Sequence, residues 1–218
     1  MKKEIQKKRL LSVILSAVLL TAFVLWTVTL YLVDVQPIGP NGSAVGLATL
    51  NASFHALTGV HMTLYTLTDW LGLIPLAAVS GFAILGLAQW IKRKRLRRVD
   101  ASILILGGFY VAVLALYVLF EAIAVNYRPI LIEGVLEASY PSSTTLLTLC
   151  IMPTAALQLH TRIHGPIIRR LIIASILLFT LFTVTARLLS GVHWLTDIIG
   201  GILISASLVL AYAVATST

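Results

Sequence analysis

Three short stretches of this chain hold the residues best suited to chemistry on an anion. The first runs Arg187-Leu-Leu-Ser-Gly-Val-His193-Trp-Leu-Thr-Asp197. If it is helical, His193 and Asp197 share a face, so the carboxylate can accept a hydrogen bond from one imidazole nitrogen and leave the other as a nucleophile. The guanidinium of Arg187 offers a planar, permanently charged fork for phosphate oxygens. A plainer interpretation stays open here: an interfacial His193 beside an anchoring Trp194, with Asp197 capping a helix.

The other two stretches also offer groups that bind anions. The second is Asn126-Tyr127-Arg128-Pro129, and the third is Ser139-Tyr140-Pro141-Ser142-Ser143-Thr144-Thr145. A proline followed by serines and threonines at a helix start supplies hydroxyls and free backbone N–H groups, which can cradle an anion. Ordinary helix capping explains the third stretch equally well when it is taken alone. All three stretches suit a single phosphate if the fold brings them to one face.

The distribution of basic residues indicates which elements must do this. Fourteen of the sixteen Lys and Arg residues lie in three segments that flank apolar stretches, and only Arg128 and Arg187 do not. The fourteen are Lys2, Lys3, Lys7, Lys8 and Arg9; Lys92, Arg93, Lys94, Arg95, Arg97 and Arg98; and Arg162, Arg169 and Arg170. Basic residues in short loops mark the cytoplasmic side of a membrane protein. The two remaining arginines are therefore predicted on the outer face, where they suggest an anion site.

The composition is that of an integral membrane protein. Apolar residues make up 59% of the chain, charged residues only 11%, and the mean hydropathy is +0.98. The net charge of +8 is confined to loops that flank apolar stretches, which favours anionic lipid head groups as partners and argues against nucleic acid. The single cysteine, Cys150, excludes an intrachain disulfide and a thiolate metal cluster. No metal or cofactor is expected.

Six apolar segments are long enough to cross a bilayer as helices. They are residues 11–33, 70–91, 101–124, 144–160, 171–189 and 197–216. The prediction is one all-α, polytopic membrane domain over 1–218, with six transmembrane helices. Both termini and all three basic segments then lie on the cytoplasmic side, with plasma membrane as the expected location. The first segment is too long for a typical signal peptide, so we expect it to be retained.

The outer segments are predicted to form a shared polar pocket near the membrane surface. Six acids fall there, namely Asp34, Asp69, Glu121, Glu133, Glu137 and Asp197, together with the two arginines and His193. Charged groups near membrane depth are costly, so they tend to face a cavity. We expect His193 and Arg187 at its solvent-facing rim. In the long first outer segment, the sequence of about residues 43–57 predicts a short helix that lies in the membrane interface. His55 and His61 in the same segment are further candidates to supply a proton.

These stretches resemble the three motifs of the type-2 phosphatidic acid phosphatase superfamily of integral membrane lipid phosphatases. The motifs are Lys-x(6)-Arg-Pro, Pro-Ser-Gly-His and Ser-Arg-x(5)-His-x(3)-Asp. Ala186, Arg187, His193 and Asp197 fit the third, with only its leading Ser changed. The resemblance implies a metal-independent reaction in which His193 attacks phosphorus and Asp197 orients it. It also implies that Arg128 and Arg187 bind the phosphoryl oxygens.

Two motif positions depart from the family pattern. Arg128-Pro129 and Pro141-Ser142 are intact, but Glu121 replaces the lysine, and Ser143-Thr144 replaces the Gly-His pair. The resemblance implies that this histidine acts as a general acid, and Thr144 has no accessible pKa for that role. Losing the general acid costs on the order of 10²–10⁴-fold in rate. Glu121 can pair with an arginine or, with a pKa raised by burial, act as the acid itself.

The predicted function is hydrolysis of a lipid-linked phosphate or diphosphate at the outer membrane face, through a phosphohistidine. Its substrate is phosphatidic-acid-like or an isoprenoid diphosphate. The candidate catalytic residues are His193, Asp197, Thr144 and Glu121, and the candidate phosphate ligands are Arg128, Arg187, Ser142 and Ser143. Two alternatives remain: a catalytically impaired member that binds or transports a phosphorylated lipid, and a lipid-phosphate transferase.

Overall fold

The computed structural model describes residues 2–217, so Met1 and Thr218 of the predicted domain lie outside the described residues. Within 2–217 the chain forms eight α-helices, two 3-10 helices and no regular strand. The α-helices are α1 (Lys2–Leu32), α2 (Ala48–Thr58), α3 (Met62–Leu71), α4 (Leu73–Arg93), α5 (Ala101–Ile123), α6 (Ser143–Arg162), α7 (Pro166–Leu189) and α8 (Leu195–Thr216). The 3-10 helices are η1 (Pro40–Gly42) and η2 (Leu96–Arg98). The predicted all-α class is confirmed.

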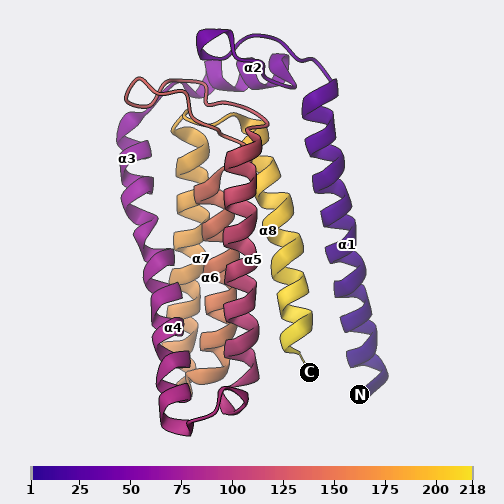
Figure 1. Cartoon of the computed structure of the whole chain (residues 1–218), viewed down its shortest axis with the longest axis vertical. Helices are drawn as coiled ribbons and strands as arrows, with labels where there is room; N and C mark the ends of the chain where they lie inside the picture. The colour runs from indigo at the N-terminus through magenta and orange to yellow at the C-terminus, as the bar shows by residue number, and fades with distance from the viewer. Residues whose placement is uncertain (1, 218) are drawn as a thin grey trace.

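The long helices run side by side, and the short helix α2 lies across one end of the bundle (Figure 1). Both chain ends lie at the opposite end, together with the α4–α5 and α6–α7 connections (Figure 1). All three basic segments therefore gather at the end that carries the termini. The segments predicted to be outer gather at the end that α2 covers, so the fold separates the two sets as the charge pattern requires.

Helix α6 is the centre of the bundle, where it contacts α4, α5, α7 and α8. Five helical segments of the described chain are long and apolar enough to cross a membrane, and α6 is not one of them. Its buried face carries Thr145, Thr148, Thr154 and Gln158. A helix surrounded by other helices does not need the apolar surface that lipid demands. The predicted fourth span, 144–160, matches α6 in extent, and the count of six spans stays a prediction.

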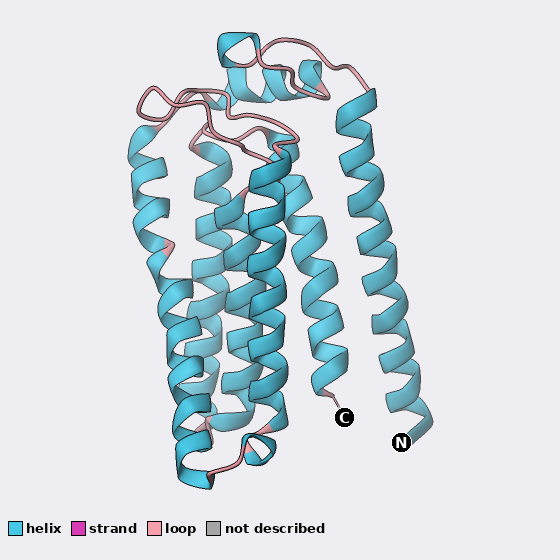
Figure 2. Cartoon of the chain, in the orientation of Figure 1, coloured by secondary structure: helices cyan, strands magenta, loops and turns pink. Residues whose placement is uncertain are grey.

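The second span is longer than the sequence indicated. It runs from Met62 to Arg93, 32 residues in all, with a short break between α3 and α4 at Gly72 (Figure 2). The prediction that residues 62–69 form part of a loop is wrong, because they are helical. The threonines and Tyr65 make this stretch look like a loop, but Thr68 is fully buried and its hydroxyl bonds to the carbonyl of Leu64 at 2.9 Å.

Polar contacts fasten α1 to α8. The Ser16 hydroxyl donates to the carbonyl of Ser207 at 2.9 Å, and the Ser207 hydroxyl donates to the carbonyl of Ser16 at 2.8 Å. Near the other end, the Trp26 indole donates to the carbonyl of Thr196 at 3.2 Å. Hydrogen bonds of this kind hold helices together where both are surrounded by hydrocarbon. They also fix the first turn of α8, which carries Asp197.

Candidate active site

The carboxylate of Asp197 is the fixed point of the site. Its Oδ2 accepts from the backbone N–H of Trp194 at 2.9 Å, and its Oδ1 accepts from the side-chain amide of Asn126 at 3.4 Å. Asp197 is fully buried. The first of these bonds is a helix N-terminal cap, so the plainer interpretation of Asp197 holds for one oxygen. The same oxygen lies 3.6 Å from Nδ1 of His193.

His193 reaches Asp197 from a loop rather than from a helix face. Residues 190–194 connect α7 to α8, and α8 begins only at Leu195. Gly191 makes this loop possible: its φ is +68°, and a Cβ there would lie 1.9 Å from the carbonyl oxygen of Gly59. The His55 ring bonds to the carbonyl of Gly191 at 3.0 Å. The end of α2 and the turn that follows it therefore hold the His193 loop in place.

The two isolated arginines meet over one aromatic ring. The guanidinium carbon of Arg187 lies 4.7 Å from the ring centroid of Tyr65, and that of Arg128 lies 5.8 Å from it. Arg187 also donates to the hydroxyl of Thr68 at 3.2 Å. Because the electron-rich face of tyrosine attracts cations, this ring holds two like charges at one place. The segment assigned to the outer loop by the sequence thus builds the base of the arginine pair.

Arg128 and Glu137 lie opposite each other in the connection between α5 and α6. The backbone N–H of Arg128 donates to the carbonyl of Glu137 at 3.0 Å, and the Arg128 Nε lies 2.9 Å from the Glu137 carboxylate. The backbone N–H of Ser139 donates to the carbonyl of Asn126 at 2.8 Å. These bonds draw the second and third polar stretches together beside the third motif.

Several buried nitrogen and oxygen atoms at this place have no hydrogen-bond partner. They are Nη1 of Arg128, Nε of Arg187, both ring nitrogens of His193 and the hydroxyl of Ser139. A buried polar group left unpaired costs about 1–3 kcal/mol, more when it is charged, so such groups are rare in proteins. The two guanidinium nitrogens, the Ser139 hydroxyl and one nitrogen of the neutral imidazole can donate a hydrogen bond, and the guanidinium nitrogens belong to cations. Together they suit a small anion with several oxygen atoms.

The structure corrects two expectations about the pocket. His193 and Arg187 do not lie at a solvent-facing rim: they are 3% and 1% exposed, because the α2–α3 turn and the α5–α6 connection cover them. Nor do all six acids share the pocket. Asp34 instead accepts from the backbone N–H of Thr49 at 2.7 Å, and Asp69 and Glu133 are exposed. Glu121, Glu137 and Asp197 lie beside the arginines and His193, and the charge of the exposed Asp69 also acts on Arg187.

A small polar pocket brings Glu121 and Ser143 to His193. Its lining also includes Ser139 and Tyr140. Thr144, the next residue along α6, is not part of that lining and is partly exposed. The hydroxyl of Ser142 accepts from the backbone N–H of Thr145 at 3.4 Å, so Ser142 caps α6, as the capping interpretation predicted.

The other predicted proton donors lie elsewhere. His55 bonds to the loop backbone at Gly191 and packs against Trp194, with ring centroids 5.5 Å apart. His61 is exposed, and its backbone N–H donates to the carbonyl of Ser190 at 2.9 Å. Both histidines therefore support the His193 loop from outside. Within residues 2–217, no group of three or more His, Cys, Asp or Glu side chains is placed to hold a metal ion.

Four residues of the site were not assigned a role from the sequence. Tyr65 and Thr68 contact the arginines, Asn126 bonds to Asp197, and Ser139 contributes an unpaired hydroxyl. Asn126 and Ser139 fall within polar stretches that the sequence pointed to. Nothing in the sequence pattern indicated a role for Tyr65 or Thr68, because Arg187, which both of them contact, is more than a hundred residues away in the chain.

Burial makes the histidine a neutral base. Burial first, and then the positive charges of Arg187 and Arg128, hold the pKa of His193 well below its usual value of 6.5. In the unfolded chain this histidine binds a proton below about pH 6.5, whereas in the folded protein it does not. The unfolded state therefore gains protons on acidification, and the free energy of unfolding falls as the pH drops below about 6.5.

This linkage predicts that the stability of the protein depends on pH, and that replacing His193 weakens this dependence. Between about pH 7.5 and 5.5 the unfolding temperature of the wild type should fall more than that of His193→Gln, which has no titrating side chain at position 193 and keeps all the others. Thermal unfolding of both proteins in the same detergent measures it. Parallel curves for the two proteins would contradict a neutral, buried His193.

Comparison with solved structures identifies the fold. The chain superposes on a protein described as the first transmembrane PAP2 type phosphatidylglycerolphosphate phosphatase from Bacillus subtilis, with a TM-score of 0.58 and 18% sequence identity. The alignment covers 91% of this chain and 94% of that one. The resemblance to the type-2 phosphatidic acid phosphatases is thus confirmed at the level of the fold, and the chain is an integral membrane protein. No family model and no curated protein sequence matches the chain.

Proposed function

We propose that the protein hydrolyses a lipid-linked phosphate or diphosphate through a covalent phosphohistidine at His193. One observation carries the proposal: unpaired, buried guanidinium nitrogens of Arg128 and Arg187 lie beside His193, whose ring lies against the carboxylate of Asp197. A phosphoryl group supplies the acceptor oxygens that these donors lack. The phosphatase activity named for the protein with the same fold supports this choice among anions.

The geometry favours one ring nitrogen of His193 as the nucleophile. Nδ1 faces Asp197 at 3.6 Å, a distance that is long for a hydrogen bond in the unliganded site and can tighten when substrate binds. With its proton on Nδ1, the ring presents the Nε2 lone pair to phosphorus. The N–P bond forms as the bond to the lipid oxygen breaks, and the two arginines stabilise the charge on the equatorial oxygens. Water then attacks the phosphohistidine and releases phosphate.

Glu121 is the alternative acid: if the protein hydrolyses a lipid monophosphate as well as a diphosphate, we propose that Glu121 protonates the leaving oxygen. It lines the same small pocket as His193, whereas Thr144, at the position of the family's histidine, does not. Ser143 lines that pocket too and can bind a phosphate oxygen. A protonated Glu121 would deliver its proton to the lipid oxygen and then act as the base for the attacking water.

We place the site at the outer face of the membrane, with both termini in the cytoplasm. The basic segments, which favour the cytoplasmic side, lie at the far end of the bundle from the α7–α8 connection, which carries His193 (Figure 1). An impermeant thiol reagent added to intact cells should therefore label Val135→Cys and should not label Leu96→Cys. These positions are 58% and 56% exposed, and the native Cys150 is buried. The reverse pattern would place the site in the cytoplasm.

A phosphate-release assay on purified protein tests the proposed reaction. Phosphatidic acid, phosphatidylglycerolphosphate and an isoprenoid diphosphate, each in mixed micelles, cover the monoester and diphosphate classes. Release of inorganic phosphate from at least one is expected. Binding of these lipids without turnover would favour the impaired, lipid-binding alternative, and transfer of the phosphoryl group to an added alcohol instead of water would favour the transferase.

A further inference from the structure

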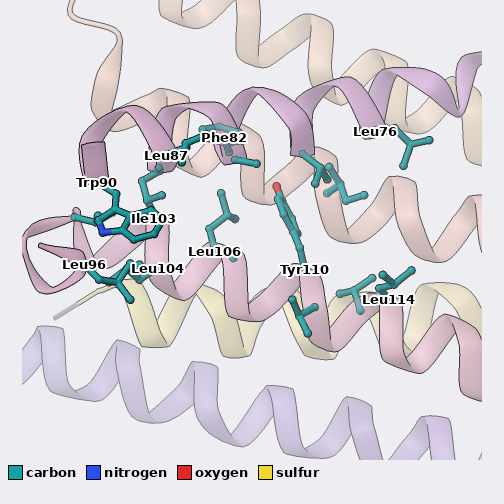
Figure 3. A pocket seen from close by; sticks show the side chains of 18 of the residues that line it. Leu76, Phe82, Leu87, Trp90, Leu96, Ile103, Leu104, Leu106, Tyr110 and Leu114 are labelled. Carbon is teal, nitrogen blue, oxygen red and sulfur yellow. The ribbon is translucent and has the colours of Figure 1, made fainter. Parts of the chain in front are cut away.

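A long apolar groove lies between α4 and α5, away from the candidate active site (Figure 3). Its volume is about 550 Å³, and its lining includes Phe82, Leu87, Trp90, Ile103, Tyr110 and Leu114. Almost all of this lining is hydrocarbon or aromatic ring. A cavity of this size and character suits a flexible hydrocarbon chain, and a membrane protein meets such chains on every side.

The groove extends to the basic end of the bundle. Leu96 and Val99, which line it there, belong to the α4–α5 connection itself. At its other end the lining ends at Leu76 of α4, Leu114 of α5 and Leu147 of α6, and Leu114 lies seven residues and about 10 Å along α5 before Glu121. From Ile103 to Leu114 the helix rises about 16 Å, roughly half of a 30 Å hydrocarbon core. The groove therefore fits a chain of one leaflet whose polar group lies at the basic end.

The connection at that end carries a large excess of positive charge. Residues 92–98 include six cations, namely Lys92, Arg93, Lys94, Arg95, Arg97 and Arg98. One acid follows them, and Asp100 lies 2.9 Å from Arg93 and 3.7 Å from Arg162. Within the part of the chain that the structure describes, the other five cations have no carboxylate within 4.0 Å. They are exposed and free to bind an anionic group.

We propose that the groove and residues 92–98 form a binding site for an anionic phospholipid of the leaflet at the basic end. One acyl chain lies along α4 and α5, and the phosphate of the head group meets the unpaired cations. Trp90 lies at the level between them, where indole rings favour the membrane interface. This lipid is distinct from the substrate, because Arg128 and His193 lie at the opposite end of the bundle. The site does not depend on the proposed reaction.

Two neighbouring glycines of α5 allow a matched test of the groove. A Cβ added at Gly107 or Gly108 meets no atom within 4 Å, but only Gly107 lines the groove. Gly107→Leu should fill the groove and lower the affinity of the full-length protein for phosphatidylglycerol about ten-fold, measured by native mass spectrometry, while Gly108→Leu should leave it unchanged. Both substitutions replace glycine by a better helix former, so helix α5 should persist. Equal affinities for the two variants would overturn the proposal.

The binding of the head group is tested by removing three positive charges, either from residues 92–98 or from another basic segment. Replacing Lys94, Arg95 and Arg97 by glutamine should remove the preference for phosphatidylglycerol over phosphatidylcholine with identical chains, a change of about ten-fold or more. The control replaces Lys3, Lys7 and Arg9 at the start of α1, a helix that contributes no residue to the lining of the groove. Loss of the preference in the control as well would mean general attraction to charge and would contradict a built site. Neither readout uses phosphate release.

Discussion

Replacing His193 by alanine is expected to abolish phosphate release, with a loss on the order of 10³-fold or more in kcat. Of the described histidines, His193 alone is buried, and it lies beside both arginines. The substitution should leave the fold intact, because both ring nitrogens lack hydrogen-bond partners and Asp197 keeps its bonds to Trp194 and Asn126. Phosphate release and thermal unfolding, measured on the same preparation, separate the two effects.

His164→Ala is the matched control for this substitution. His164 is exposed in the α6–α7 connection, at the basic end of the bundle. Its removal should change neither turnover nor stability. Turnover near that of the wild type in His193→Ala, or a loss through His164→Ala, would remove the basis for placing the reaction at this site.

The second large effect concerns the choice of substrate. A lipid monophosphate must expel an alkoxide, which needs a proton, whereas a lipid diphosphate expels a phosphate that is already stable as an anion. With threonine at 144, hydrolysis of monophosphates should suffer more than hydrolysis of diphosphates. We expect the wild type to prefer a lipid diphosphate, and Thr144→His to raise kcat/KM for the monophosphate by up to about 10²-fold, with a smaller gain for the diphosphate.

Glu121 provides the internal check on this prediction. If the wild type hydrolyses monophosphates as well as diphosphates, another residue supplies the proton, and Glu121→Gln should then remove monophosphate activity selectively. Its position in the pocket with His193 makes it the first residue to test. Selective loss in Glu121→Gln would overturn the diphosphate preference and keep the reaction.

The fold was largely predictable because membrane helices follow from length and charge. Apolar runs of about 20 residues and the three basic segments predicted the order of the long helices and the end of the bundle at which each loop lies. Residues 144–160 were predicted as a span and form α6, although α6 is more polar than the helices that surround it. One detail was out of reach: residues 62–69 resemble a loop because Tyr65 and Thr68 turn toward Arg187.

The site was predictable where its residues follow a fixed spacing. Arg187, His193 and Asp197 belong to one short segment, so their proximity could be read from the sequence, and Arg128 stood out as a cation outside the basic segments. The ring of Tyr65 beneath both arginines could not be predicted, since it joins residues far apart in the chain. The burial of His193 was missed for the same reason. The α2–α3 turn and the α5–α6 connection cover it, and both are distant from it in the chain.

The most direct test of the central claim is to trap the phosphoryl group on the enzyme. The purified protein would be mixed briefly with a lipid diphosphate labelled in its terminal phosphate, quenched in alkali, and digested for mass spectrometry. We predict an acid-labile phosphoryl group on His193, absent from His193→Ala and present in His164→Ala. Phosphate release at the wild-type rate with no label on His193 at any quench time would contradict the phosphohistidine mechanism.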